Sequence, residues 1–412
     1  MGWTKLHKVV VTGMGCVSGL GADVASNWVA ARDGRCAIRP VTVAVRGQAA
    51  LSIDTVAAPA VENALAALEA RHGGKVVNAA DRFANFAAAA TLEALADAGL
   101  TGSPVLATAH LVYGNASGGN RAIEAGFQRL FDAKLAHVNP RTVAQIMPSA
   151  AASHLSMLFG IKGLSFAIAS ACASSAHAIG EAMHMIRAGR CAVAVVGGSD
   201  ASLTFALLRS WHDLTAISAN GCRPFSAGRA GTNLGEGGAT LILEDEEHAR
   251  ARGARIHAEI LGAGSTSDAN HVTQPDQASA AAAIRAAHAD ARIDVEEPVL
   301  ISAHGTGTLL NDRCEAAALH AVYGAHLRNS TVIATKSAHG HLQGASGALE
   351  LILGIKALQA RVAPPVLGYL GPDPDCALPL ALEARPIAVS TLVSPSFAFG
   401  GLNSVIVARL PQ

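Results

Sequence analysis

The segment Ala169-Ser170-Ala171-Cys172-Ala173-Ser174-Ser175 joins a strand-like apolar run to an apolar stretch that predicts a helix over Ala173–Ala188. Along that stretch apolar residues recur at helical spacing, at Ala176, Ile179, Met183 and Ile186, and Gly189 follows its end. A similar segment, Gly344-Ala345-Ser346-Gly347-Ala348, opens another apolar helix after a strand, 172 positions beyond Cys172. This spacing suits a chain built from two duplicated α/β halves.

Strand-like and helical stretches alternate along the rest of the chain. The expected strands are Val9–Thr12, His110–Tyr113, Cys191–Val196, Ala239–Leu243, His257–Leu261, Val299–Ser302, Val332–Thr335 and Ser404–Ala408. Several are apolar throughout, which is typical of strands covered on both faces. A helix is expected over Asp81–Ala98, because Asp81 can cap its start and Gly99 can adopt the left-handed conformation after its end. The alternation predicts an α/β fold.

The composition is that of a globular protein with a large core. Half of the 412 residues are hydrophobic and only 15% are charged, which excludes an intrinsically disordered chain. The 31 Lys and Arg residues balance the 31 Asp and Glu residues, unlike the basic composition of nucleic-acid-binding proteins. No run reaches the roughly 18 consecutive apolar residues of a membrane-spanning helix. We therefore expect neither nucleic acid nor a membrane as a partner.

The cysteines indicate a reducing compartment. There are seven, at positions 16, 36, 172, 191, 222, 314 and 376, and no Cys-x-x-Cys pair occurs among them. An odd count without paired spacing argues against a disulfide framework or a zinc ribbon. The stretch Met1–Lys8 also lacks the long apolar core of a signal peptide. A cytoplasmic protein is the simplest expectation.

A charged stretch, Glu244–Arg255, lies between two expected strands and is the best candidate for a boundary. It divides the chain into residues 1–250 and 251–412.

The glycine-rich segment Gly13–Gly21 invites comparison with a dinucleotide-binding loop. The GxGxxG pattern requires glycine at position 18, where Ser18 stands, and no acidic residue follows about 20 positions later. The segment therefore favours a structural strand-to-loop turn over a nicotinamide site.

Cys172 has the sequence context of a nucleophile. It lies where an apolar segment meets a helix, so unpaired N–H groups and the helix dipole are expected to lower the pKa of its thiol. Small neighbouring residues would let a substrate approach the sulfur. The alternative is a buried, inert cysteine, which is the usual state of a free thiol.

Two histidine motifs also follow strands. One is Ala303-His304-Gly305-Thr306-Gly307-Thr308 and the other is Lys336-Ser337-Ala338-His339-Gly340-His341. Each could instead hold only structural histidines, and no carboxylate or cysteine spacing supports a metal site. A third segment, Phe397-Ala398-Phe399-Gly400-Gly401, precedes the last strand and could form an aromatic gate or a packed loop.

Taken together, a helix-start cysteine and two histidine-bearing strand ends fit one reaction class. The carboxyl ends of strands in α/β sheets are where sites form. A thiol nucleophile and imidazole donors for a developing oxyanion are the groups that thioester acyl transfer requires.

In combination these motifs resemble the β-ketoacyl-acyl-carrier-protein synthases of the thiolase superfamily, almost from end to end of the chain. The motifs that carry the resemblance are Ser170–His177, Ala303–Glu315, Lys336–His341, Arg223–Phe225, Gly235–Gly237, Asp268–Pro275 and Phe399–Gly401. The closest likeness is to the decarboxylating, elongating Cys-His-His enzymes, because His341 stands where the Cys-His-Asn initiating enzymes carry asparagine.

The resemblance implies a five-layer αβαβα thiolase-like fold of two duplicated α/β halves. The half over 1–250 would carry the nucleophile, and the half over 251–412 both catalytic histidines. It also implies an acyl carrier protein as partner and a homodimer, or a heterodimer with a related ketosynthase-like subunit. No resident cofactor or metal is implied, since the phosphopantetheine arm of the carrier protein arrives with the substrate.

The same resemblance implies roles for the reacting groups. Cys172 would accept the acyl chain as a thioester. His304 and His341 would hydrogen-bond the carbonyl of a malonyl thioester and stabilise the enolate left when CO₂ departs. The backbone N–H groups of Cys172 and Phe399 would form the oxyanion hole for attack on the acyl thioester.

Further residues would support these groups. Lys336 and Glu315 are expected to orient the two histidines. Thr306, Thr308 and Thr273 are expected to contact the phosphopantetheine arm.

Five positions depart from the family pattern. Thr232 stands where a bulky aromatic residue is usual, with polar Asn233 beside it, and Ser117 replaces a pocket-floor aliphatic residue. Pro395 replaces an asparagine before the gate, and Ala398 replaces the first glycine of the gate, so the gate is expected to open differently. These changes predict a substrate pocket that is wider or more polar, suited to a polyketide, polyene or other specialised chain.

Three other functions are weighed against this one. A non-catalytic partner subunit would share the fold but typically lacks the nucleophile, a nicotinamide oxidoreductase fails at Ser18, and a Cys-His peptidase leaves the second histidine unexplained. Arg209 is a weak candidate for a basic carrier-docking patch, and a solvated surface arginine is the simpler interpretation.

Overall fold

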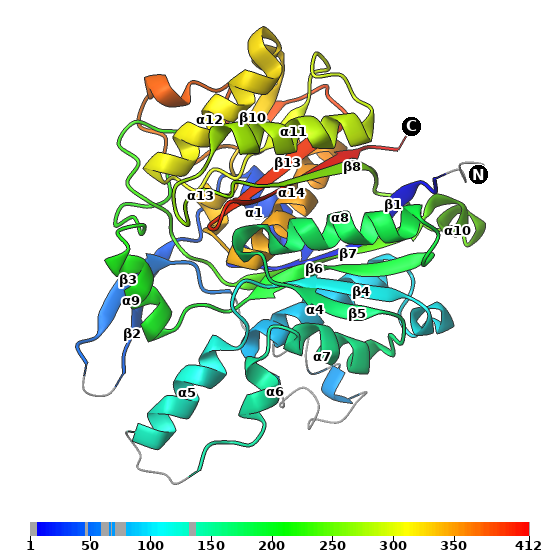
Figure 1. Cartoon of the computed structure of the whole chain (residues 1–412), viewed down its shortest axis with the longest axis vertical. Coiled ribbons are helices and arrows are strands. Elements are labelled where there is room, and N and C mark those ends of the chain that lie inside the picture. The colour runs from blue at the N-terminus through cyan, green and yellow to red at the C-terminus, as the bar shows by residue number, and fades with distance from the viewer. Residues whose placement is uncertain are drawn as a thin grey trace.

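A single sheet runs through the computed structural model, which describes residues 6–45, 48–58, 66, 68–70, 80–131 and 137–411. Residues 1–5, part of the stretch considered for a signal peptide, lie outside this range. The strands of the sheet are β1 (Val9–Val17), β4 (His110–Gly114), β5 (Ser165–Ile168), β6 (Val193–Asp200), β7 (Gly237–Asp245), β8 (Ala258–Ser267), β9 (Leu300–Ser302), β10 (Thr331–Ile333), β13 (Thr391–Ala398) and β14 (Leu402–Arg409). Within the described ranges their order is β10-β9-β13-β14-β8-β1-β7-β6-β4-β5 (Figure 1).

This strand order shows an internal duplication. If the strands of each half are numbered along the chain, β1-β7-β6-β4-β5 and β8-β14-β13-β9-β10 both read 1-5-4-2-3. The pairing directions agree as well, because β4–β5 and β9–β10 are parallel while β6–β7 and β13–β14 are antiparallel. The halves meet where β1 pairs with β8, Val9 opposite Ile260. The expected duplicated α/β halves are confirmed.

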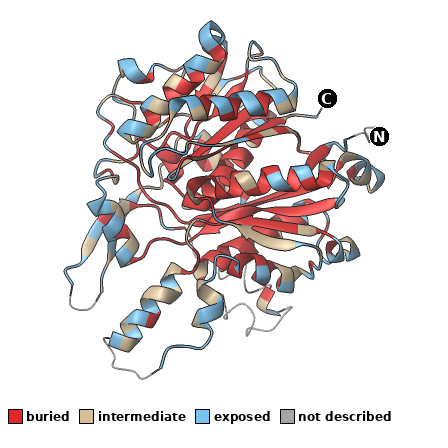
Figure 2. Ribbon diagram, in the orientation of Figure 1, coloured by how far each residue is buried: buried red, intermediate tan, exposed pale blue. Residues whose placement is uncertain are grey.

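Helices divide the molecule into five layers (Figure 1). The helices of the layers are α4 (Arg82–Asp97), α7 (Ala150–Phe159), α8 (Ser174–Arg187), α11 (Gln277–Ala291), α12 (Leu309–Tyr323) and α14 (Ser346–Ala360). Helices α8 and α14 lie between the two half-sheets, α4 and α7 cover the outer face of one half, and α11 and α12 that of the other. The apolar core is continuous through the middle layer, where α14 is almost wholly buried (Figure 2). The expected αβαβα architecture is thus confirmed.

Smaller elements surround the layers. They are α1 (Val24–Arg32), a hairpin of β2 (Arg39–Val43) and β3 (Leu51–Thr55), α5 (Asn120–Phe131), α6 (Thr142–Ile146), α9 (Phe205–Asp213), α10 (Glu246–Ala251), α13 (Lys336–His339), β11 (Val362–Ala363) and β12 (Arg385–Pro386). The division proposed between residues 250 and 251 falls within α10 and stays a prediction.

The expected helix ends are present. The Asp81 side chain accepts a hydrogen bond from the N–H of Phe83 at the start of α4. Gly99 and Gly189, after α4 and α8, both have φ of +68°, which only glycine adopts at little cost.

Strand β13 was not among the expected strands, and it contains Pro395. Pro395 pairs with Val405 of β14, whereas β9 pairs only with Leu392 and Val393. The proline therefore lies beyond the end of the β9 ladder, where no N–H is required. Pro395 and Ala398 both lie in β13, and Ala398 is its last residue. The expectation that they change how the gate opens stays a prediction. The turn itself begins at Phe399.

The glycines at the start of Gly13–Gly21 serve packing. A Cβ built on Gly13 would lie 2.2 Å from the carbonyl oxygen of Ala94, and one on Gly15 would lie 2.0 Å from that of Ala90. Glycine thus lets β1 lie directly against α4. The strand-to-loop interpretation of this segment is supported.

No described helix combines the length and apolarity needed to cross a membrane. All seven cysteines are free thiols.

Candidate active site

Cys172 lies in a short 3₁₀ turn, Ala171–Ala173, between β5 and α8. Ala171 has a positive φ of +49°, a strained conformation for a residue with a side chain. The duplicated half repeats the feature, because Gln343 has φ of +51° in the 3₁₀ turn before α14. Positions 171 and 343 are 172 residues apart, the same interval as in the sequence echo. The strained turn places the Cys172 sulfur at the N-terminal end of α8.

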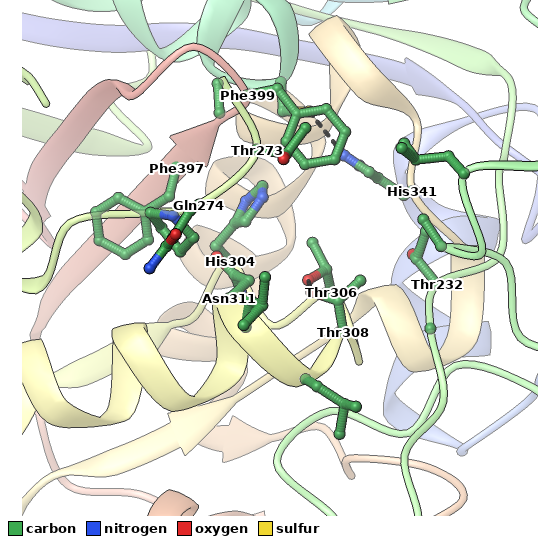
Figure 3. Close-up of a pocket in the computed structure, with 18 of the residues that line it drawn as sticks. Thr232, Thr273, Gln274, His304, Thr306, Thr308, Asn311, His341, Phe397 and Phe399 are labelled. Carbon is green, nitrogen blue, oxygen red and sulfur yellow. Dashed lines mark hydrogen bonds between the residues drawn. The ribbon is translucent and has the colours of Figure 1, made fainter. Parts of the chain in front are cut away.

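The two histidines reach the same place from the other half of the chain. His304 follows β9, and His341 follows α13. The Nε2 atom of His341 lies 3.0 Å from the Sγ atom of Cys172, and the two imidazole rings are 5.5 Å apart and nearly perpendicular. All three side chains are buried. Figure 3 shows both imidazoles turned into one space, with Phe397 and Phe399 beside them.

The Cys172 thiol is protonated in the free protein. Burial raises its pKa to about 11, although the Lys336 charge and the N–H groups of Phe399 and Cys172 act in the opposite direction. The expectation of a lowered pKa is therefore wrong, because loss of hydration outweighs the helix-end N–H groups. These N–H groups nevertheless point at the sulfur, where they can serve a developing oxyanion.

Lys336 fixes the tautomer of His304. Its ammonium lies 3.3 Å from Nδ1 of His304, donates to the His304 carbonyl oxygen at 2.5 Å, and forms a buried ion pair with Glu350. Because an ammonium has no acceptor, Nδ1 must accept and the proton must reside on Nε2. Burial and the Lys336 charge hold the pKa of His304 well below its usual value. His304 therefore presents a neutral N–H donor to the cavity.

His341 can change its tautomer. Its Nδ1 lies 2.9 Å from Oγ of Ser346, and a hydroxyl can donate or accept. Burial, followed by the Lys336 charge, holds the pKa of His341 well below its usual value. Its Nε2 can therefore accept the thiol proton in one step and donate a hydrogen bond in another.

Glu315 holds the backbone of the loop that carries His304, rather than the imidazole rings. Its buried carboxylate accepts hydrogen bonds from the backbone N–H groups of His304 at 2.7 Å and Gly305 at 2.8 Å. Burial raises the pKa of this carboxyl to about 7. Glu315 therefore acts on the position of His304 through its backbone.

A cavity of about 300 Å³ leads to the three side chains. Cys172, His304 and His341 line it together with Phe399 of the expected oxyanion hole. Four of the six expected substrate contacts also line it, and these are Thr232, Thr273, Thr306 and Thr308. The hydroxyls of Thr306 and Thr308 lie 2.9 Å apart on one wall (Figure 3).

Two family models match the chain. The model described as "Beta-ketoacyl synthase, N-terminal domain" covers residues 6–249, and "Beta-ketoacyl synthase, C-terminal domain" covers residues 257–370. The chain belongs to the β-ketoacyl synthase family. It is an acyltransferase whose activity is β-ketoacyl condensation in fatty-acid or polyketide-like chain elongation.

Two curated relatives align with nearly the whole chain. Nodulation protein E of Rhizobium sp. (strain N33) is 39% identical over 98% of this chain and 99% of its own length. The 3-oxoacyl-[acyl-carrier-protein] synthase 2 of Staphylococcus aureus (strain COL) is 33% identical over 98% of each chain. The interpretations as a nicotinamide oxidoreductase or a peptidase are thereby excluded.

Solved structures of two ketosynthase complexes have the same fold. The ishigamide ketosynthase/chain length factor superposes with a TM-score of 0.89 and 30% identity, over 99% of this chain and all of that one. A type II polyketide ketosynthase, in complex with its acyl-carrier protein, superposes with a TM-score of 0.85 and 27% identity over the same shares.

Two expected pocket residues lie outside this cavity of the synthase. Ser117 contacts Asn120 at 2.7 Å, and Asn233 donates to the carbonyl oxygens of Asp54 and Ser218, both at 2.8 Å. The Asn233 amide is therefore used to hold the backbone around it. Of the three departures expected to shape the substrate pocket, only Thr232 lines this cavity.

The sequence did not single out several residues of the synthase site. Glu350 is the one carboxylate of a mostly apolar helix, in a fully buried stretch that requires a partner for its charge, and Ser346 shares its helix. Trp211 and Asn403 line the cavity without any local sequence signal. The expected docking residue Arg209 instead forms an exposed ion pair with Asp213 at 2.9 Å.

The catalytic cluster also has the shape of a metal site. The ligand atoms of Cys172, His304 and His341 lie within 4.8 Å of one another. The absence of a resident metal therefore stays a prediction, which metal analysis of the purified protein would test.

Proposed function

We propose that the synthase loads an acyl group onto Cys172 and condenses it with a malonyl thioester of an acyl carrier protein. The observation that carries the proposal is the 3.0 Å contact between Cys172 and His341 in a cavity that His304 also lines. The test is incubation with an acyl carrier thioester and a chelator, followed by intact mass. A 3-oxoacyl product and CO₂ should appear once the malonyl carrier is added.

The loading step uses the thiol and one imidazole. His341 Nε2 takes the Cys172 proton as the sulfur attacks the thioester carbonyl, and the N–H groups of Cys172 and Phe399 hold the oxyanion. The new C–S bond forms as the carrier C–S bond breaks. His341 then returns the proton to the departing pantetheine thiol.

The condensing step uses both imidazoles. Nε2–H groups of His304 and His341 donate to the malonyl thioester carbonyl, so negative charge can collect there as the bond to the carboxylate breaks and CO₂ leaves. The resulting carbanion attacks the acyl-Cys172 carbonyl, a C–C bond forms, and the C–S bond to Cys172 breaks. The thiolate takes a proton from solvent water. His341 can present N–H in this step because Ser346 accommodates either tautomer.

The raised pKa of Cys172 predicts the pH dependence of its alkylation. Iodoacetamide reacts with the thiolate, whose fraction grows about tenfold per pH unit below the pKa. With a pKa of about 11, the rate should climb without a plateau from pH 7 to pH 10. Peptide mapping of the alkylated Cys172 at each pH measures this rate. A plateau below pH 8 would instead indicate a thiolate–imidazolium pair and contradict the neutral pair.

We propose that Thr232 forms a hydrogen bond to the phosphopantetheine arm of the substrate, across the cavity from Thr306 and Thr308. Its hydroxyl is buried, and among the described residues its side-chain neighbour for hydrogen bonding is the thiol of Cys222, a weak partner. A buried hydroxyl without a strong partner is costly, so a polar group of the bound substrate is its natural acceptor or donor. This supports the proposal of a more polar pocket, suited to a specialised chain.

Substitution of Thr232 tests this role. Thr232→Val keeps the shape and should raise KM for the carrier thioester by about 2- to 10-fold, the value of one hydrogen bond, with kcat little changed. Thr232→Ser should behave like the unaltered synthase. Steady-state kinetics with the carrier thioester measure both, and equal KM values for the Val and Ser variants would refute the contact.

The synthase is further proposed to form a homodimer, or a heterodimer with a related subunit as the name of the ishigamide complex suggests. The edge strand β5 is half-buried along its whole length. On α5, Phe127 and Phe131 stack on each other although they are 57% and 74% exposed. Such an apolar surface is typical of an interface. The solution mass of the purified chain would test this.

The remaining proposals concern location and cofactors. The seven free thiols support a cytoplasmic location. We propose no resident cofactor, since the carrier brings its own phosphopantetheine arm.

A further inference from the structure

Two aromatic rings stack at the cavity. Trp211 of α9 and Phe399, at the turn after β13, have ring centroids 5.5 Å apart and planes inclined by 19°. Both residues line the cavity that reaches Cys172. The two rings come from opposite halves of the duplicated chain, so the stack joins the halves directly beside the thiol.

The two rings differ in how firmly they are held. Trp211 packs against a small apolar cluster of Ile53, Leu203, Leu208 and Leu234, which ties α9 to the β2–β3 hairpin and to the segment that pairs with His341. Phe399 instead precedes Gly400 and Gly401, whose φ values are +81° and +70°. Glycine gives this turn alternatives that other residues lack. The stack therefore joins a glycine-containing turn to a ring that is packed against this apolar cluster.

The position of Phe399 matters to the sulfur. Its backbone N–H points at Cys172 Sγ and favours the negatively charged sulfur. The ring is 36% exposed, so burial alone does not hold it in place. Two backbone hydrogen bonds also hold the turn. The Gly400 N–H donates to the Val272 carbonyl oxygen at 2.7 Å, and the Asp268 N–H donates to the Gly401 carbonyl oxygen at 2.9 Å. The stack with Trp211 is the contact that the Phe399 side chain itself makes.

We propose that Trp211 is a positioning residue that holds Phe399 closed over Cys172, with the Phe399 N–H at the oxyanion position. Entry of an acyl chain then requires the stack to open, and attack on a thioester carbonyl requires it to close again. Aromatic pairs contribute about 0.5–1.5 kcal/mol beyond their buried area, so the stack can be broken and remade in each turnover. This inference rests on the proposed function only where its test measures acyl transfer.

Trp211→Ala tests the proposal with two readings. Alkylation of Cys172 by iodoacetamide should become about 3- to 10-fold faster because the turn opens, while acyl transfer becomes slower by a similar factor because the N–H is misplaced. Peptide mapping should show the buried thiols of Cys16 and Cys222 still protected. Trp211→Phe should restore both rates to within about 2-fold, and the control His212→Ala, an exposed neighbour on α9, should change neither.

A double variant completes the test. If Trp211 acts through Phe399, then Trp211→Ala with Phe399→Ala should match Phe399→Ala alone in both rates. The proposal is overturned if Trp211→Ala leaves both rates unchanged, if Trp211→Phe is as impaired as Trp211→Ala, if the two effects add, or if Cys222 becomes reactive as well. Alkylation needs no acyl substrate, so failure to find an acyl adduct would refute the proposed function and leave this test standing.

Discussion

Replacement of Cys172 by alanine should abolish the acyl adduct and the condensation reaction while the fold remains. The side chain is buried and its sulfur is the only proposed acceptor of the acyl group, so condensation should fall by at least about 10³-fold. Deleting one small buried sulfur should cost about 1 kcal/mol of stability. Intact mass after exposure to an acyl carrier thioester, followed by product analysis, measures the first effect, and thermal unfolding measures the second.

The same variant separates the two steps of the mechanism. Breakage of the malonyl C–C bond relies on His304 and His341, so Cys172→Ala should still release CO₂ from a malonyl thioester. His304→Ala should lose that release while it keeps the thiol available for acylation. Cys16→Ala, a matched deletion of another buried thiol, should change neither reaction. Condensation by Cys172→Ala, or an acyl adduct on it, would contradict the mechanism.

Local patterns were enough to predict an α/β fold with two related halves, whereas the five-layer αβαβα arrangement was implied by the family resemblance. The helix-start signals at Asp81 and Gly99 act within a few residues, and apolar runs mark strands covered on both faces. The echo at Gly344 was visible because the duplicated turns need the same small residues around a strained φ. Strand β13 was not predicted, and the feature that allows Pro395 within it is the short length of β9, which lies some 90 residues away in the chain.

The site could be predicted in its residue types but not in its electrostatics. Cys172, His304 and His341 were recognisable from their positions at strand and helix ends. The pKa of Cys172 depends on how completely the three layers around it exclude water, a property of the assembled core rather than of the helix start. The partners of Lys336 and Phe399, which are Glu350 and Trp211, are likewise set by packing between distant segments.

Lys336→Met is expected to have the second large effect. Lys336 and Glu350 are both wholly buried, and removal of one partner from such a pair costs about 3–5 kcal/mol. Methionine cannot donate to Nδ1 of His304, so the imidazole can place its proton there and lose its donor toward the cavity. Loss of one such donor costs about 10²- to 10³-fold, so CO₂ release should fall by that factor. Urea unfolding and CO₂ release from malonyl carrier measure the two effects.

A second substitution separates stability from catalysis in this pair. Lys336→Met combined with Glu350→Leu removes the stranded carboxylate, and replacement of a buried ion pair by apolar residues of similar size is often neutral or stabilising. The double variant should therefore recover most of the lost stability yet remain as slow in CO₂ release as Lys336→Met. The reason is that nothing then keeps the His304 proton on Nε2. Acylation of Cys172, which relies on His341, should suffer less than CO₂ release in both variants. If the double variant recovered CO₂ release together with stability, Lys336 would be a structural residue only, and the tautomer argument for His304 would fail.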